Sequence, residues 1–324
     1  MHKILVTGGA GYVGAILVPK LRKAGHQVRV LDLFLYAEPN IFSNEIEVIE
    51  GDLRNRGLVR EALSGCDTVI HLAGISNDPS SDLDPELTRE VNIRATEDLI
   101  DSSRDLGVKR FINASSSSVY GIKEEPEVTE DLPLQPLTVY SESKVAIEDY
   151  LEKKKGKMVS VSVRSATVCG FSPRMRLDLT VNILTHHALK KGKISVFGGS
   201  QKRPNIHIED ITDFYLSLVT APSELIDAQK FNVCGANHTV AQIAELVRSE
   251  VAPHCPVEVV PTNDLRSYHI AADRVKKQLG FAPKHSIEEA IRDVAAAFKR
   301  NAIPDPENDR YYNVKVMKKI LTLS

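Results

Sequence analysis

The sequence predicts an α/β fold with a doubly wound parallel sheet and a smaller second lobe, and three observations support this. Through the first half of the chain, apolar runs of strand length alternate with helical patterns, which is typical of β-α-β units with helices on both faces of a parallel sheet. A glycine-rich loop joins the first strand to the first helix, and the second half has shorter strands. The runs of the first half lie at residues 3–6, 28–31, 48–49, 68–72, 110–113 and 160–164.

The second half is expected to form the smaller α/β lobe. Its strands are predicted at 194–197, 231–233 and 257–260, and its helices near 239–250 and 286–299. We place the larger domain at residues 1–170 and the smaller at 171–324, and we expect the chain to return to the first sheet at about 204–236. The polar tail after Pro304 is expected to wrap the surface.

Composition excludes several classes of function. The 324 residues include 41 basic and 43 acidic side chains, which gives a net charge of −2 and argues against nucleic acid as a partner. The four cysteines form no C-x-x-C pair and the histidines show no ligand spacing, so we expect neither a disulfide framework nor a metal site. No apolar stretch approaches the length that spans a bilayer, and the first residues lack the apolar region of a signal peptide. We therefore expect a cytoplasmic protein without a membrane partner.

The glycine-rich loop is typical of a dinucleotide site. The first strand is followed by Thr7-Gly8-Gly9-Ala10-Gly11-Tyr12-Val13-Gly14 and then by a helical pattern. Glycines at 8, 11 and 14 allow a tight turn, a close approach of backbone N–H groups to a pyrophosphate, and close packing of the helix on the sheet. We expect cofactor contacts from Gly8, Gly11, Tyr12, Val13 and Gly14.

Two carboxylates are predicted to meet the adenosine half of this dinucleotide. Asp32 closes the second strand, 18 residues after Gly14, where a carboxylate accepts hydrogen bonds from a ribose. It would repel a 2′-phosphate, and residues 33–35 supply no arginine to bind one, so NAD is favoured over NADP. Asp52, with Leu53 after it, is placed to reach the adenine edge or, alternatively, to cap the next helix.

Tyr140 and Lys144 form a candidate catalytic pair. They are four residues apart and therefore share one face of a predicted helix. An ammonium beside the phenol favours the phenolate, so we expect the tyrosine pKa to fall from about 10 toward the range that exchanges protons at neutral pH. The strand at 110–113 runs into four serines at 115–118, and a hydroxyl at a strand end can share the proton of a substrate oxygen.

Taken together, these motifs resemble the extended short-chain dehydrogenase/reductase family, and within it the NAD-dependent nucleotide-sugar epimerase/dehydratase branch. The resemblance covers most of the chain. It rests on T-G-x-x-G-x-x-G at 7–14, H-L-A-G at 71–74, the serine-rich segment at 115–121, Y-x-x-x-K at 140–144 and R-P-N-I-H-I-E-D at 203–210. It implies a Rossmann-type fold with NAD as cofactor, further cofactor contacts from Leu72, Ala73 and Gly74, and a homodimer formed through two helices from each chain.

The same resemblance implies a role for each catalytic residue. Tyr140 acts as acid or base, Lys144 holds the nicotinamide ribose, and Ser116 orients the substrate oxygen. Dehydratases of this branch carry Asp-Glu directly after that hydroxyl, where this chain has Ser117 and Ser118, so dehydration is disfavoured. The leading hypothesis is a nucleotide-sugar epimerase, with C4 as the favoured carbon and a transient keto-sugar. The alternatives are a nucleotide-sugar 4-dehydrogenase or ketoreductase, an NAD-linked reductase of a non-nucleotide substrate, and a non-catalytic NAD-sensing protein.

Residues on the substrate side are also predicted. Asn182 matches the phosphate-contacting asparagine of the family, and Arg203 or Arg266 is expected to neutralise the diphosphate or, alternatively, to form a surface ion pair. Three further residues are expected to touch the sugar, with turn formation as the alternative for the first two; they are Ser76, Asn77 and Ser117. Cys169 stands where many relatives have tyrosine and is expected to be a small apolar filler.

Overall fold

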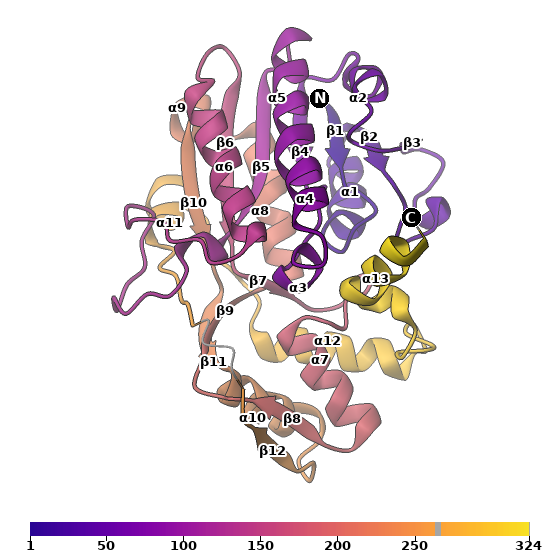
Figure 1. The fold of residues 1–324 in the computed structure, drawn as a ribbon, viewed down its shortest axis with the longest axis vertical. Helices are drawn as coiled ribbons and strands as arrows, with labels where there is room; N and C mark the ends of the chain where they lie inside the picture. Colours follow the sequence, from indigo (N-terminus) through magenta and orange to yellow (C-terminus); the bar gives the residue numbers. More distant parts are fainter. Residues whose placement is uncertain (263–266, 324) are drawn as a thin grey trace.

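The computed structural model describes residues 1–262 and 267–323, and its larger lobe is built on a seven-stranded parallel sheet (Figure 1). The strand order is β10-β6-β5-β4-β1-β2-β3, so the direction of winding reverses beside β1. The strands are β1 (Lys3–Thr7), β2 (Gln27–Asp32), β3 (Glu47–Glu50), β4 (Thr68–His71), β5 (Arg110–Ser116), β6 (Val159–Ser165) and β10 (Gln229–Val233). The predicted Rossmann-type α/β fold is confirmed. The division into domains at residue 170 stays a prediction.

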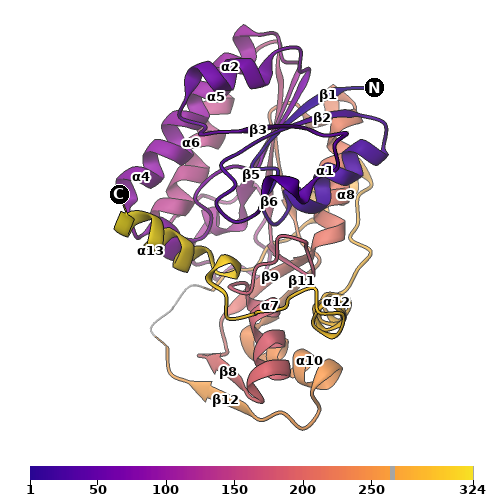
Figure 2. The ribbon, with the colours of Figure 1, turned by 90° about the vertical axis from the view of Figure 1, so that its right-hand side faces the viewer.

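Helices cover both faces of this sheet (Figure 2). One face carries α1 (Gly14–Lys23) and α8 (Ile208–Thr220), and the other carries α2 (Arg56–Leu63), α5 (Ala95–Asp105) and α6 (Val139–Lys153). Successive side chains of a strand point to opposite faces. In β1, Ile4 and Val6 accordingly belong to the core beneath α1 and α8, whereas Leu5 belongs to the core on the other side. Because both faces are buried, the strands are almost continuously apolar.

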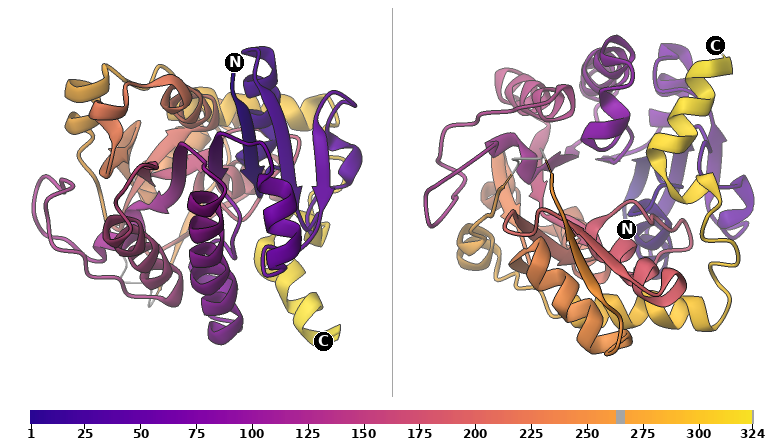
Figure 3. Two further views of the ribbon diagram at one scale, coloured as in Figure 1. Left: turned by 90° about the horizontal axis from the view of Figure 1, so that it is seen from above. Right: turned by 60° about the horizontal axis from the view of Figure 1, so that its bottom comes forward.

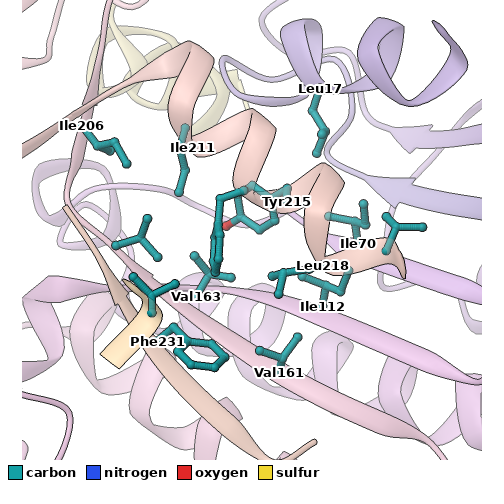
Figure 4. Packing of buried hydrophobic residues seen from close by; sticks show 14 of the residues in the cluster. Leu17, Ile70, Ile112, Val161, Val163, Ile206, Ile211, Tyr215, Leu218 and Phe231 are labelled. Atoms are coloured by element: carbon teal, nitrogen blue, oxygen red, sulfur yellow. The ribbon is translucent and has the colours of Figure 1, made fainter. Parts of the chain in front are cut away.

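Figure 4 shows the packing between the sheet and α8. Ile112 and Phe231 come from β5 and β10, and they belong to the same buried cluster as Leu218 of α8 and Leu17 of α1. All four side chains are fully buried. The sheet is therefore held rigidly between two helical layers, which fixes where its carboxyl ends lie.

The smaller lobe lies below the larger one in Figure 1. It contains a three-stranded sheet of β11 (Ala236–Thr239), β9 (Lys202–His207) and β7 (Thr167–Cys169), and a parallel pair of β8 (Ile194–Phe197) and β12 (Val257–Val260). A core shared with α7 (Thr180–His186), α10 (Val240–Val251) and α12 (Ile287–Lys299) holds it together. The two predicted helices of this half are confirmed as α10 and α12, and each begins with a capping box.

Shorter helices complete the chain. They are α3 (Asp78–Ser81), α4 (Pro85–Arg89), α9 (Ser223–Ile226), α11 (Asp273–Leu279) and α13 (Asn313–Leu323), together with short 3-10 and π-helical turns. Among residues 1–262 and 267–323, no helix has the length and apolarity needed to cross a membrane.

The C-terminal tail differs from the expectation that it only wraps the surface. It forms α13, which lies along the larger lobe (Figures 2 and 3) and contacts α3. Asn313, Met317 and Ile320 of α13 line the cavity described below. Their spacing of four and three residues puts them on one helix face. This helical pattern is the reason that the tail packs inward despite its polar composition.

A buried ion pair ties α6 to the sheet. Nη2 of Arg164 in β6 lies 2.6 Å from Oε2 of Glu148 in α6, and both side chains are at most 2% exposed. Ser115 donates a further hydrogen bond to Glu148 at 2.5 Å, and Arg164 donates one to the hydroxyl of Tyr120 at 2.8 Å. The carboxylate and the guanidinium are therefore satisfied by β5, β6 and α6 together.

We expect Glu148→Ala to lower the free energy of unfolding by about 3–5 kcal/mol, because it leaves the Arg164 charge buried without its partner. The matched control is Glu258→Ala, which breaks an ion pair with Lys193 in which both side chains are about half exposed. It should change stability far less. Denaturant titration of both variants measures the difference, and equal losses would contradict this account of the pair.

Candidate active site

A cavity of about 550 Å³ opens at the carboxyl edge of the large sheet. Its walls come from the ends of β1, β2, β5 and β6, from the loop after β4, and from residues of the smaller lobe and α13. In open parallel sheets this edge, beside the point where the winding reverses, is where ligands bind. The residues predicted from the sequence to be catalytic, to bind the cofactor or to contact the sugar all line this cavity. Of the residues predicted to bind the substrate diphosphate, Asn182 and Arg203 do not line it, and Arg266 lies outside the described residues.

The glycine loop has no room for a side chain at Gly8 or Gly14. Gly8 has φ +70°, and a Cβ there would lie 2.6 Å from the backbone nitrogen of Ala73. A Cβ at Gly14, the first residue of α1, would collide with the backbone of Gly9. The loop thus packs tightly against the residues that follow β4 and presents its backbone to the cavity. This cradle suits the pyrophosphate of a dinucleotide at the start of α1.

Asp32 holds the loop and keeps acceptor capacity toward the cavity. Its Oδ2 accepts a hydrogen bond from the backbone N–H of Ala10 at 2.9 Å, and its Oδ1 accepts one from Phe34 at 2.8 Å. Each carboxylate oxygen can accept a second hydrogen bond, so a ribose hydroxyl has an acceptor here. Burial raises the pKa of Asp32 above its usual value, although the backbone hydrogen bonds act in the opposite direction.

Asp52 and Leu53 also line the cavity. The alternative that Asp52 caps the next helix is wrong, because Asn55 caps α2 by accepting a hydrogen bond from Leu58. Asp52 instead pairs with Arg54 at 2.6 Å. Burial raises the pKa of Asp52, but the hydrogen bonds and charge of Arg54 outweigh it, so the net shift is downward.

Tyr140 and Lys144 project from the first turns of α6 into the cavity. Thr138 caps this helix in a reciprocal capping box with Ser141. The ammonium of Lys144 donates to the carbonyl oxygen of Ala114 at 2.8 Å and lies 5.5 Å from the centre of the Tyr140 ring. The end of β5 and the start of α6 therefore hold the pair in place.

The direction of the tyrosine shift is opposite to the sequence-based expectation. Burial and the negative charge of Asp78 raise the pKa of Tyr140 to about 12, although a hydrogen bond with Ser116 acts against them. Burial also lowers the pKa of Lys144 to about 8, against the effect of Glu148. Removal of both groups from water favours their neutral forms more than the ammonium favours the phenolate.

The serines at the end of β5 differ in their contacts. Ser116 faces Tyr140 and accepts hydrogen bonds from the backbone N–H and the hydroxyl of Ser118, at 3.2 and 3.0 Å. Ser117 is 2% exposed and lines the cavity. No carboxylate stands at either position after Ser116.

Ser76 and Asn77 lie on the cavity wall but have structural partners as well. Asn77 has φ +84° and its side chain caps α3, which agrees with the turn-forming alternative. It also donates to Asp178 at 3.2 Å. Ser76 accepts a hydrogen bond from Asn313 at 2.9 Å.

Asn182 and Arg203 do not line the cavity. Asn182 is fully buried, and its amide donates to the Tyr12 hydroxyl at 3.0 Å and to the carbonyl of Arg176 at 2.9 Å. It thus fastens α7 to the glycine loop. The guanidinium of Arg203 lies 5.3 Å from the ring of Tyr268, which does line the cavity. The binding roles of both residues stay predictions.

Several cavity residues were absent from the sequence-based set. They include Tyr36, Arg174, Arg176, Tyr215, Tyr268, Asn313, Met317 and Ile320. Two arginines separated by one residue, in the polar segment after Gly170, were the available signal for Arg174 and Arg176. Within the described residues, no group of three histidine, cysteine or acidic side chains is arranged to hold a metal ion. Cys169 is fully buried, and burial raises the pKa of its thiol.

Comparisons with known proteins agree with this geometry. The UDP-glucose 4-epimerase of Corynebacterium glutamicum is 28% identical over 319 residues, covering 91% of this chain and 95% of that protein. The structure of Thermotoga maritima UDP-glucose 4-epimerase with UDP-glucose matches with a TM-score of 0.85 and 26% identity, covering 92% of this chain and 99% of that one. The Thermus thermophilus UDP-glucose 4-epimerase in complex with NAD matches with a TM-score of 0.81 and 26% identity, at the same coverage.

A profile of the NAD dependent epimerase/dehydratase family matches residues 4–234, which is more than half of the chain. The predicted resemblance, the enzymatic nature of the protein and its NAD cofactor are confirmed. The glycine cradle and Asp32 are the features of this chain that fit that cofactor. The chain belongs to the NAD dependent epimerase/dehydratase family.

Proposed function

We propose that this chain is an NAD-dependent nucleotide-sugar epimerase that inverts C4 of the sugar. The observation that carries the proposal is that Tyr140, Lys144 and Ser116 meet in the cavity of the glycine cradle. Two serines, at 117 and 118, stand where a dehydratase would need carboxylates. The similarity to UDP-glucose 4-epimerases over nearly their whole length supports the same activity.

The side chains supply the proton chemistry of this reaction. When bound, NAD would supply the acceptor and donor of the hydride on the sugar carbon. Tyr140, in its phenolate form, takes the proton of the hydroxyl on that carbon, and Ser116, which lies beside the phenol, orients the same oxygen. Loss of the hydride and the proton gives a ketone. Return of the hydride to the other face, with the proton returning from Tyr140 to the oxygen, gives the epimer.

Residues around this pair are proposed to hold the sugar nucleotide. Ser76, Asn77 and Ser117 form the sugar wall, and Asn182 and Arg203 support the nucleotide. We also propose that residues 1–170 mainly bind NAD and residues 171–324 mainly bind the nucleotide sugar. The protein is proposed to act as a cytoplasmic homodimer without nucleic-acid or membrane partners, on the basis of its family resemblance and balanced charge.

The proposal is tested by incubating the enzyme with a panel of UDP-, GDP-, CDP- and dTDP-sugars while recording NADH absorbance and the stereochemistry of the product. We expect an epimer without net NADH. Net NADH would instead identify a dehydrogenase, and no reaction across the panel would point to a non-nucleotide substrate.

Tyr140→Phe should lower turnover by about 10²–10⁴-fold and leave NAD bound. Tyr150→Phe on the same helix, whose hydroxyl contacts Asp101, serves as the control.

The pH dependence of NAD binding tests the role of Lys144. Its pKa of about 8 means that the ammonium is charged below this pH and neutral above it. A charge-assisted hydrogen bond to the ribose weakens when the charge is lost, so we expect NAD affinity to fall roughly five- to tenfold as pH rises from 7 to 9.5. Lys144→Met should remove this dependence, and Lys154→Met, at the C-cap that follows α6, should keep it. Calorimetric titrations with NAD at several pH values test this expectation. An unchanged pH profile of NAD affinity in Lys144→Met would refute the role of the Lys144 charge in NAD binding.

A further inference from the structure

Arg174 is buried in the cavity wall with hydrogen-bond donors left unused. Its side chain is 4% exposed, and it belongs to the loop between β7 and α7. Its Nε and Nη1 atoms have no hydrogen-bond partner among the described residues. Unsatisfied buried donors on a charged group are costly. A guanidinium kept in this state beside an open cavity points to an acceptor that the ligand supplies.

The protein holds Arg174 in position without neutralising its charge. The guanidinium lies 4.3 Å from the centre of the Tyr36 ring, and Nη2 donates to Oδ1 of Asn313. Within the described residues, no carboxylate forms a salt bridge with it. The neighbouring Arg176, in contrast, makes two hydrogen bonds to Asp178, at 2.8 and 3.1 Å. The ring and the amide therefore orient the Arg174 fork and leave its charge for an anion.

The neighbours of Arg174 place it at the cofactor end of the cavity. Tyr36 follows β2, whose last residue is Asp32, and the charges of Arg174 and Asp32 act on each other. Arg176, in contrast, is close enough to Tyr140 for each to affect the other's pKa. Arg174 thus lies toward Tyr36 and Asp32 at the end of β2, where the cofactor is expected, and Arg176 lies toward the catalytic tyrosine.

We propose that Arg174 binds the diphosphate of the bound dinucleotide, and that the C-terminal helix α13 positions it there. A guanidinium fork matches the spacing of phosphate oxygens. The glycine cradle supplies backbone N–H groups to the same anion. This inference concerns the cofactor and holds for any sugar substrate, so it does not depend on the proposed epimerase activity.

Asn313 is the residue through which α13 acts. It is 3% exposed and is the first residue of the helix. Besides accepting from Arg174, it donates to Ser76 through its side chain at 2.9 Å and to Asp178 through its backbone at 3.0 Å. The helix start is therefore fastened to both walls of the cavity. Met317 and Ile320 continue this lining along α13.

The bound dinucleotide is first removed from the protein. The protein is then titrated in a calorimeter with ADP-ribose and, separately, with UDP. ADP-ribose carries the cofactor's diphosphate without the nicotinamide, and UDP carries a diphosphate of the substrate type. In Arg174→Gln we expect the ADP-ribose dissociation constant to rise at least about tenfold, with a smaller rise in Arg174→Lys, and UDP binding to stay within twofold. Arg300→Gln, which removes a guanidinium stacked 4.5 Å from Phe171 outside the cavity lining, should change neither.

Unchanged ADP-ribose binding in folded Arg174→Gln overturns the proposal. So does a loss confined to UDP, which would assign Arg174 to the substrate diphosphate. Asn313→Asp provides a second test if Arg174→Gln does not fold, because it places a carboxylate of equal size against the guanidinium. That carboxylate competes with the diphosphate, so the ADP-ribose dissociation constant should again rise, while Asn301→Asp, in the exposed turn after α12, should leave it unchanged. Full affinity in Asn313→Asp would also overturn the proposal.

Discussion

The buried ion pair between Glu148 and Arg164 determines where the catalytic helix lies. Glu148 follows Lys144 by four residues and Tyr140 by eight, so the three side chains share the face of α6 that meets the sheet. Burial of two charges gives little net stability, because their desolvation offsets their attraction. The pair instead fixes the position of α6 relative to the sheet. The carboxylate is satisfied only when α6 is placed so that Arg164 and Ser115 both reach it, and this placement also brings Tyr140 to the end of β5.

Burial in the cavity also disfavours the charged forms of two catalytic side chains. It raises the pKa of Tyr140 and lowers that of Lys144, so both groups tend toward neutrality in the cavity. Arg174 and Arg176 differ, because a guanidinium stays charged at neutral pH even in a buried site. The cavity therefore combines one unpaired cation, Arg174, and the Arg176–Asp178 pair with a phenol and an amine that can exchange protons. Such a wall suits ligands that carry diphosphates, and it leaves proton transfer to the helix that the ion pair positions.

Features encoded by local pattern were predictable from the sequence. The glycine loop, the strand ends and the Tyr140 to Lys144 spacing are local, and the structure brings them to one cavity. The contact of Arg174 with Asn313 joins residues 139 positions apart, in two polar segments that give no apolar signal. The pKa of Tyr140 moved against expectation because the extent of burial is a property of the packed molecule. Asp52 was open to two interpretations because a carboxylate at this position in the sequence can either cap a helix or line a cavity.

The central claim is that one hydride leaves the sugar carbon and returns to it within a single cavity. The most direct test uses a nucleotide sugar deuterated at C4, with the epimer analysed by NMR and mass spectrometry. The account predicts that the epimer keeps its deuterium at C4 and that incubation of unlabelled sugar in D₂O introduces none there. Exchange of the C4 label with solvent would contradict the account, because it would mean that the carbon is inverted by proton abstraction and not by hydride transfer.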